Sequence, residues 1–168
     1  MTRGGVALAV FLASAAACVG QAFLYAAALP ARVASHFGPD GVPNAWMSRD
    51  RLVALDLCVV GLLTIVFLGI ALLFRSVGTA SINLPNRDYW LAPERRAETV
   101  DSLSRSCLWF GAGTLLLMLD VFRQVFRFNL SASGALEHPR ASLAAYLAFA
   151  AAWIAAFFRR FARTPPAP

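Results

Sequence analysis

The sequence contains no lysine: all 15 of its basic residues are arginines, and charged residues of either sign make up only 14% of its 168 positions. It has only three cysteines, without any CxxC pair, which gives neither a disulfide framework nor a zinc site. No Walker loop, GxGxxG, GxSxG or nucleic-acid motif is present. We therefore expect no enzymatic activity, no cofactor and no nucleic-acid partner.

Histidine is equally scarce, with only two copies in the chain. His36, together with Asp40 and His138, is the best candidate for binding a metal ion. Catalytic zinc needs three protein ligands in a suitable geometry, and a lone loop histidine more often makes a hydrogen bond. We therefore expect no metal site, and the sequence leaves open whether His36 acts as a pH sensor.

What the sequence has in abundance is apolar residues, which make up 59% of it, against about 45–50% in a typical soluble domain. They form four long runs, each able to cross a hydrocarbon core of about 30 Å as a helix. The predicted spans are residues 6–29, 52–74, 107–128 and 142–161. Lipid permits only helices or closed barrels, and these runs do not alternate as barrel strands do. The predicted fold is all-α, a four-helix transmembrane bundle forming one membrane domain over residues 1–168.

The first run also has the outline of a signal peptide, because Arg3 precedes apolar residues and small residues precede Cys18. Apolar regions of signal peptides contain about 7–15 residues, whereas this run continues to Leu29. We expect it to be retained as a membrane helix.

Polar segments of different character join the predicted spans. Residues 30–51 form a hairpin with a strong turn signal at Gly38-Pro39-Asp40-Gly41. Residues 75–106 form a long connection, whose second half begins with Ala92-Pro93-Glu94 and has apolar residues along one side. This pattern predicts an amphipathic helix that lies on the membrane and leads into the third span.

The arginines predict the orientation in the membrane. The N-terminus, the long connection and the C-terminal tail carry more arginines than the hairpin and the short loop before the fourth span. Because basic residues mark the cytoplasmic side, we expect both termini and residues 75–106 in the cytoplasm and the hairpin outside. The predicted location is a bacterial cytoplasmic (inner) membrane, which the chain crosses several times.

Polar residues inside the predicted spans fall into one layer beneath the hairpin when helix depths are compared. They are Gln21, Asp56, Asp120, Arg123 and Gln124. Because an unpaired carboxylate is costly in hydrocarbon, we predict the pairs Asp56–Arg123 and Asp120–Gln124. Two interpretations stay open, a ligand or proton site and a buried ion pair that fixes helix order. Asp120 and Arg123 are also close enough in sequence to pair within one helix.

Two motifs carry a resemblance to a known family. The hairpin contains Leu29-Pro30, His36-Phe37-Gly38, Asp40-Gly41, Pro43-Asn44, Trp46 and Ser48-Arg49. It resembles a bacterial membrane domain of unknown function that also occurs at the start of SdpI-type immunity proteins. The block NLPNRDYW, residues 83–90, followed by APERR at 92–96, is similar to a cytoplasmic signature of short, stand-alone relatives.

The resemblance implies a membrane location and importance for the residues of both motifs. In the hairpin these are Pro30, His36, Phe37, Gly41 and Trp46, as sites for a ligand or partner. In the cytoplasmic motif they are Asn83, Pro85, Asn86, Asp88, Tyr89, Trp90 and Glu94. The chain departs from SdpI-type proteins because it lacks their additional membrane region.

The leading functional hypothesis is a non-enzymatic inner-membrane protein of SdpI-like type that binds or senses an extracytoplasmic factor, in toxin immunity or signalling. Its expected partners are the lipid bilayer, an extracytoplasmic peptide or protein, and a cytoplasmic protein. One alternative is a small transporter or transporter subunit that uses the intramembrane Asp/Arg cluster. Another is a structural membrane scaffold.

Overall fold

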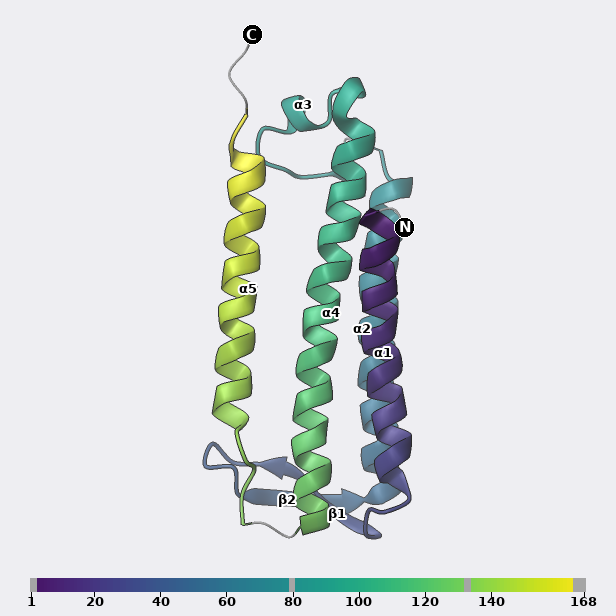
Figure 1. Ribbon diagram of the computed structural model, residues 1–168, viewed down its shortest axis with the longest axis vertical. Coiled ribbons are helices and arrows are strands. Elements are labelled where there is room, and N and C mark those ends of the chain that lie inside the picture. Colours follow the sequence, from purple (N-terminus) through teal and green to yellow (C-terminus); the bar gives the residue numbers. More distant parts are fainter. Residues whose placement is uncertain (1–2, 79–80, 132–133, 165–168) are drawn as a thin grey trace.

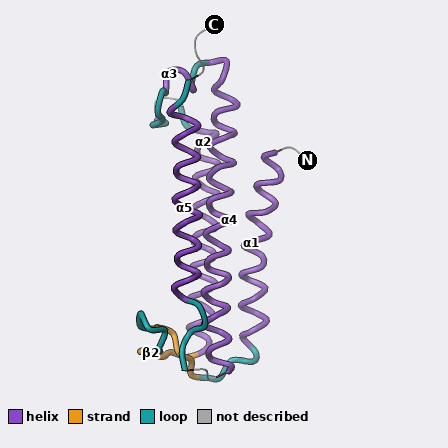
Figure 2. Tube along the Cα trace, turned by 60° about the vertical axis from the view of Figure 1, so that its left-hand side comes forward, coloured by secondary structure: helices purple, strands orange, loops and turns teal. Residues whose placement is uncertain are grey.

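The computed structural model describes residues 3–78, 81–131 and 134–164. Its elements, in chain order, are α1 (Arg3–Ala26), β1 (Arg32–Phe37), β2 (Pro43–Ser48), α2 (Arg49–Ser76), α3 (Arg87–Trp90), α4 (Pro93–Ser131) and α5 (Pro139–Ala162). The four long helices run along one axis, and the two strands lie across one end of them (Figures 1 and 2). We call this the hairpin end, and we call the opposite end, where α1 begins and α5 ends, the terminal end.

Each of the four long helices is long and apolar enough to cross a membrane, which confirms the predicted four-helix bundle. Many large apolar side chains on their outer faces are exposed, among them Leu24 at 81% and Ile65 at 71%. In water such a surface would be unfavourable, whereas in a bilayer it faces hydrocarbon. The protein is therefore a multi-pass membrane protein.

The centre of the bundle is α4, which packs against α1 and α2 on one side and against α5 on the other (Figure 1). Phe11 of α1, Val60 of α2 and Leu115 of α4 are buried together in the middle of this core. Gly113 lets α5 come close, because a Cβ at this position would lie 2.4 Å from the Phe149 ring. The helix α5 is thus tied to the bundle through α4.

The long connection differs from the prediction in one respect. Its amphipathic segment is not a separate helix on the membrane surface, because α4 is one helix of 39 residues that includes both this segment and the third span. At about 1.5 Å per residue it is roughly 58 Å long, more than a hydrocarbon core requires. The apolar side of the segment instead packs on protein: Leu103 is buried in a cluster with Leu91 and Phe161 at the terminal end.

The hairpin is a two-stranded antiparallel sheet in which Arg32 faces Ser48, Val33 faces Met47 and Ala34 faces Trp46. Its turn lies where the sequence predicts it, since the Gly41 N–H donates to the Gly38 carbonyl at 2.9 Å. Gly41 has φ 80°, a conformation that glycine adopts without steric cost. On the inner face, Val33 is buried in a cluster with side chains at the ends of α2 and α4.

Candidate functional site

The outer edge of β1 is occupied by a side chain of α4. The Ala34 N–H donates to Asn129 Oδ1 at 2.7 Å, and Asn129 Nδ2 donates to the Ala34 carbonyl at 3.0 Å. The amide of Asn129 therefore pairs with the backbone of Ala34 as a residue of a third strand would. Both backbone groups of Ala34 that face away from β2 are satisfied in this way.

The outer edge of β2 has no such partner. The Arg49 N–H donates to the Ala31 carbonyl, which marks these two residues as a hydrogen-bonded pair. Because such pairs alternate with non-hydrogen-bonded ones along an antiparallel ladder, Ala34 and Trp46 form a non-hydrogen-bonded pair. The Trp46 N–H and C=O consequently point away from β1, and no residue that the structure describes is hydrogen bonded to them. This is the free edge of the hairpin.

Two side chains stand beside the free edge. The Trp46 side chain is half exposed, and the Arg32 guanidinium lies 6.0 Å from the centre of its ring. They line an open hollow of about 360 Å³. An accessible indole and a guanidinium next to unpaired backbone groups can hold an extended chain, because backbone hydrogen bonds give affinity and side-chain hollows give selectivity.

Other predicted hairpin residues hold the sheet in place rather than line this hollow. His36 Nδ1 lies 2.5 Å from Asn44 Oδ1 across the hairpin, and the Phe37 ring packs edge-on against Phe128 of α4 at 5.0 Å. Pro30 is exposed in the turn between α1 and β1. Among the described residues, no group of three or more His, Cys, Asp or Glu side chains could hold a metal ion.

The turn of the hairpin is fastened to the start of α5. Arg140 donates to the Pro39 carbonyl from Nη2 at 2.9 Å and from Nε at 3.2 Å. The Leu136 N–H donates to the Gly41 carbonyl at 3.1 Å. With Asn129 on one side and Arg140 on the other, the hairpin is held in position before any ligand arrives.

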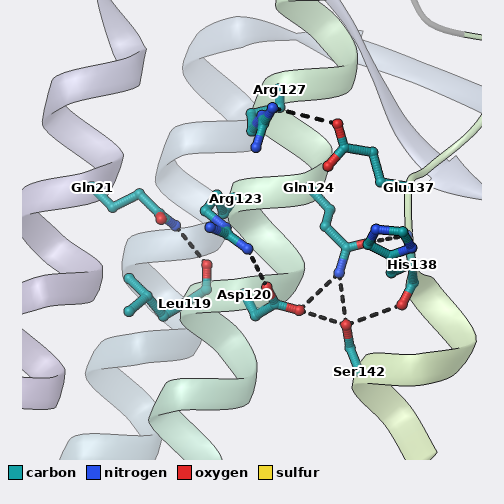
Figure 3. A network of polar contacts seen from close by, with 9 residues as sticks. All are labelled: Gln21, Leu119, Asp120, Arg123, Gln124, Arg127, Glu137, His138 and Ser142. Carbon is teal, nitrogen blue, oxygen red and sulfur yellow. Dashed lines mark hydrogen bonds and ion pairs between the residues drawn. The ribbon is translucent and has the colours of Figure 1, made fainter.

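Below the hairpin, a polar network joins α4 to α5 (Figure 3). The carboxylate of Asp120 accepts hydrogen bonds from Gln124 at 2.8 Å and from Ser142 at 2.5 Å, and it pairs with Arg123 at 3.0 Å. Gln124 Oε1 in turn accepts from the backbone N–H of His138 at 3.0 Å. The predicted Asp120–Gln124 pair is confirmed, and so is the alternative that Asp120 and Arg123 pair within one helix. Because Ser142 of α5 is hydrogen bonded to both Asp120 and Gln124 of α4, the network stabilises the α4–α5 contact.

The predicted Asp56–Arg123 pair is wrong. Arg123 bonds to Asp120, which is three residues away on the same helix and needs no interhelical alignment. Asp56 is 1% exposed inside the bundle, and its Oδ2 has no hydrogen-bond partner among the described residues. The depths of the two residues agree, but depth does not fix the side of the helix on which a residue lies.

Gln21 lies at the same level but makes a different contact. Its Nε2 donates to the Leu119 carbonyl at 2.9 Å, which links α1 to α4 (Figure 3). The predicted polar layer is thus three separate features: the network around Asp120, the Gln21 bond and the unpaired Asp56.

At the terminal end, the NLPNRDYW block covers the end of α5. Asn86 Nδ2 and Trp90 Nε1 both donate to the Phe161 carbonyl, at 3.0 and 2.9 Å. Asn86 has φ 51°, the left-handed conformation that asparagine tolerates better than most residues. The Trp90 carbonyl accepts from Thr99 at 2.8 Å, which ties the block to α4 as well.

The remaining residues of the predicted cytoplasmic motif do not bond to the end of α5 as the structure describes it. Tyr89 stacks under Arg95, whose guanidinium lies 4.0 Å from its ring centre. Pro85 is half-buried, whereas the side chains of Asn83, Asp88 and Glu94 are exposed. The motif therefore combines residues that cap α5 with residues on the surface.

Sequence reasoning missed Asn129, Arg140 and Ser142, which fasten the hairpin and α5. Each lies at or beyond the end of an apolar run, where polar residues are common and carry no signal of their own. A polar residue four positions after Val125, on the side of α4 that packs against the hairpin, is the pattern that could have indicated Asn129.

Comparison with known proteins gives one match. No curated protein and no solved structure is significantly similar to the chain. The one match is to a protein-family model and covers most of α1, the whole hairpin and the first half of α2, about a third of the chain. Residues 9–62 match the family model described as a domain of unknown function, DUF1648.

Proposed function

We propose that this protein is a non-enzymatic membrane protein that binds an extended peptide segment of another molecule along the free edge of β2. The observation that carries the proposal is the outward-facing, unpaired N–H and C=O of Trp46 beside an exposed indole. An incoming strand would add to β2 through its backbone, and its side chains would contact Trp46 and Arg32.

The chemistry of β2 supports this role. Natural sheets usually protect an exposed edge with charged residues, prolines or a covering element. The strand β2, PNAWMS, contains no charged residue and has a proline only at its first position. The two edges of the sheet differ, because Asn129 is hydrogen bonded to the edge of β1 and leaves the edge of β2 open.

The distribution of arginines favours a hairpin on the extracytoplasmic side of a bacterial inner membrane, with both termini in the cytoplasm. A secreted peptide is an extended ligand that would reach β2 there. We therefore infer toxin immunity or peptide signalling as the process, in line with the resemblance to SdpI-type proteins. The surface residues of the NLPNRDYW block, Asn83 and Asp88 among them, are where we propose that a cytoplasmic protein binds.

The proposal is tested by rescue of a host that lacks this protein and is challenged with secreted peptide toxins. Trp46→Ala removes the indole but keeps the backbone N–H, whereas Trp46→Pro removes both and leaves the β1–β2 bonds in place. Trp109→Ala is the matched control, because Trp109 is an exposed tryptophan on α4 far from the hairpin in sequence. We expect rescue by wild type and Trp109→Ala, weaker rescue by Trp46→Ala, and none by Trp46→Pro. Full rescue by Trp46→Pro at normal membrane levels would contradict strand addition.

A second candidate function, transport of protons or small cations, is favoured by Asp56 alone. Its buried Oδ2 has no hydrogen-bond partner in the described part of the chain, and unpaired carboxyl groups inside membrane bundles often mark such pathways. Asp120 gives this candidate no support, because its carboxylate is fully engaged. The test is ion flux into vesicles that contain the protein. Flux that Asp56→Asn abolishes without lowering thermal stability would support transport rather than peptide binding as the function.

A further inference from the structure

We propose that the terminal end of the bundle holds an anionic phospholipid, with the lipid phosphate in a cavity between α1, α2 and α4. The cavity has a volume of about 530 Å³, which lies within the range of small-molecule pockets. It lies at the opposite end of the molecule from the hairpin, so the proposal does not depend on peptide binding.

The polar side of the cavity carries an excess of positive charge. Arg3 and Arg75 line it, and Asp101 is the acidic residue among its lining side chains. Asp101 pairs with Arg75 at 3.1 Å and also with Arg105, so its charge is already balanced. An anion entering the cavity would therefore meet arginines and no free carboxylate. A guanidinium binds phosphate through two parallel hydrogen bonds, which a compact ammonium group cannot provide.

A serine hydroxyl also lines the cavity. Ser104 of α4 lines the cavity and is only 2% exposed. Other serines in the helices, such as Ser14, bond to the carbonyl four residues earlier. The Ser104 hydroxyl is a hydrogen-bond donor at the wall of the cavity. A phosphate oxygen in the cavity would accept from it.

The first turn of α1 also lines the cavity. A Cβ at Gly4 would lie 3.5 Å from Asp101 Oδ1 and 4.0 Å from Arg75 Nη2, so the first turn of α1 lies directly beside the Arg75–Asp101 pair. This turn contains no acidic residue. The backbone dipole of a helix start favours an anion, which adds to the attraction of the arginines.

The other side of the cavity is apolar, which distinguishes a lipid from a free phosphate ion. Leu108 lines the cavity and is buried, while Leu8 and Leu72 also line it and are exposed on the outer surface of α1 and α2. An acyl chain could follow these leucines out of the cavity while the phosphate stays with the arginines. In the predicted orientation this end faces the cytoplasm, and basic pockets between helices on that side are known to hold anionic headgroups.

The test measures lipid binding to the purified full-length protein by native mass spectrometry and by thermal stability in detergent. The probes are phosphatidylglycerol, phosphatidylcholine with the same acyl chains, and inorganic phosphate. We expect phosphatidylglycerol to bind at least about fivefold more tightly than phosphatidylcholine, given the contribution of one basic residue near a membrane surface. Inorganic phosphate should bind far more weakly than the anionic lipid.

Three variants locate the site. Arg75→Gln and Arg3→Gln should each reduce the preference for phosphatidylglycerol about fivefold. Arg3 is exposed at the start of α1, so its substitution leaves the fold intact even if Arg75→Gln destabilises the protein. Arg159→Gln is the control, because Arg159 is an exposed arginine in the last turn of α5 and does not line the cavity.

Equal affinity for the two lipids would overturn the proposal. So would an equal loss in Arg159→Gln, which would indicate general attraction to a basic surface. Inorganic phosphate that binds as tightly as the lipid and displaces it would indicate a phosphate site without the lipid.

Discussion

Asn129 and Ala34 form a two-point hydrogen-bonded pair that joins α4 to the hairpin, with distances of 2.7 and 3.0 Å. This pair fixes which edge of the two-stranded sheet is closed. It also leaves β2, with the outward-facing backbone of Trp46, as the strand available to a partner. The asymmetry of the hairpin is therefore set by one side chain that comes from the far end of a transmembrane helix.

Replacing Asn129 with leucine should release β1. Both Ala34 backbone groups would lose their partner, and each buried, unsatisfied polar group costs about 1–3 kcal/mol. We expect a lower unfolding temperature and faster hydrogen exchange at the Ala34 amide. Asn83→Leu is the control, since Asn83 is exposed at the other end of the molecule. Unchanged exchange at Ala34 would show that Asn129 does not hold the strand.

Gly41→Ala should destabilise the turn. The residue has φ 80°, and an added Cβ would lie 3.2 Å from the Leu136 nitrogen, which donates to the Gly41 carbonyl. A left-handed conformation costs a residue with a side chain roughly 1–2 kcal/mol. Gly20→Ala is the matched control, because nothing lies within 4 Å of its Cβ position in α1. Thermal unfolding should separate the two, with the control unchanged or more stable.

Asp120→Asn should weaken the attachment of α5. The neutral amide replaces a carboxylate that pairs with Arg123 and accepts from Ser142, so a charge-assisted contact between α4 and α5 is lost. Hydrogen bonds to charged groups contribute about 1.5–3 kcal/mol. We expect reduced thermal stability and easier proteolysis of the loop before α5. Ser76→Ala, which removes only a bond within the last turn of α2, should change neither.

Loss of ion flux in Asp120→Asn, with stability unchanged, would be the opposite result. It would indicate a transport pathway through the α4–α5 contact.

Trp90→Phe should loosen the end of α5. The phenyl ring keeps the aromatic packing against Phe161 but cannot donate to the Phe161 carbonyl. Asn86→Gly removes the second donor while it permits the left-handed backbone at this position. Each loss should cost about 1 kcal/mol, and the double variant more than either. Faster hydrogen exchange in the last turn of α5 is the expected readout, with Trp109→Phe as control.

The four spans and the hairpin turn could be predicted because their signals are local. Apolar runs fix the helices, and Gly38-Pro39-Asp40-Gly41 fixes the turn without reference to the rest of the chain. The length of α4 was underestimated because the signal that decides it is not local. The amphipathic pattern before the third span fits a membrane surface as well as it fits the buried cluster around Phe161, and only packing separates the two.

Contacts between distant residues could not be predicted in the same way. Asp56 and Arg123 share a depth, yet the side of the helix on which each lies depends on how three helices pack. The partner of Trp90 is 71 residues away, and nothing near the NLPNRDYW block indicates that it caps α5. Asn129 likewise replaces a strand that the sequence gives no reason to expect.

The most direct test of the free edge is hydrogen exchange at the Trp46 and Ala34 amides of the protein in lipid nanodiscs. It should be measured without ligand and with a secreted peptide toxin to which a host lacking this protein is hypersensitive. We predict slow exchange at Ala34 in both states, and exchange at Trp46 that is fast in the free protein and slow with the peptide. Protection of Trp46 in the free protein, or fast exchange there while the peptide is bound, would contradict strand addition at β2.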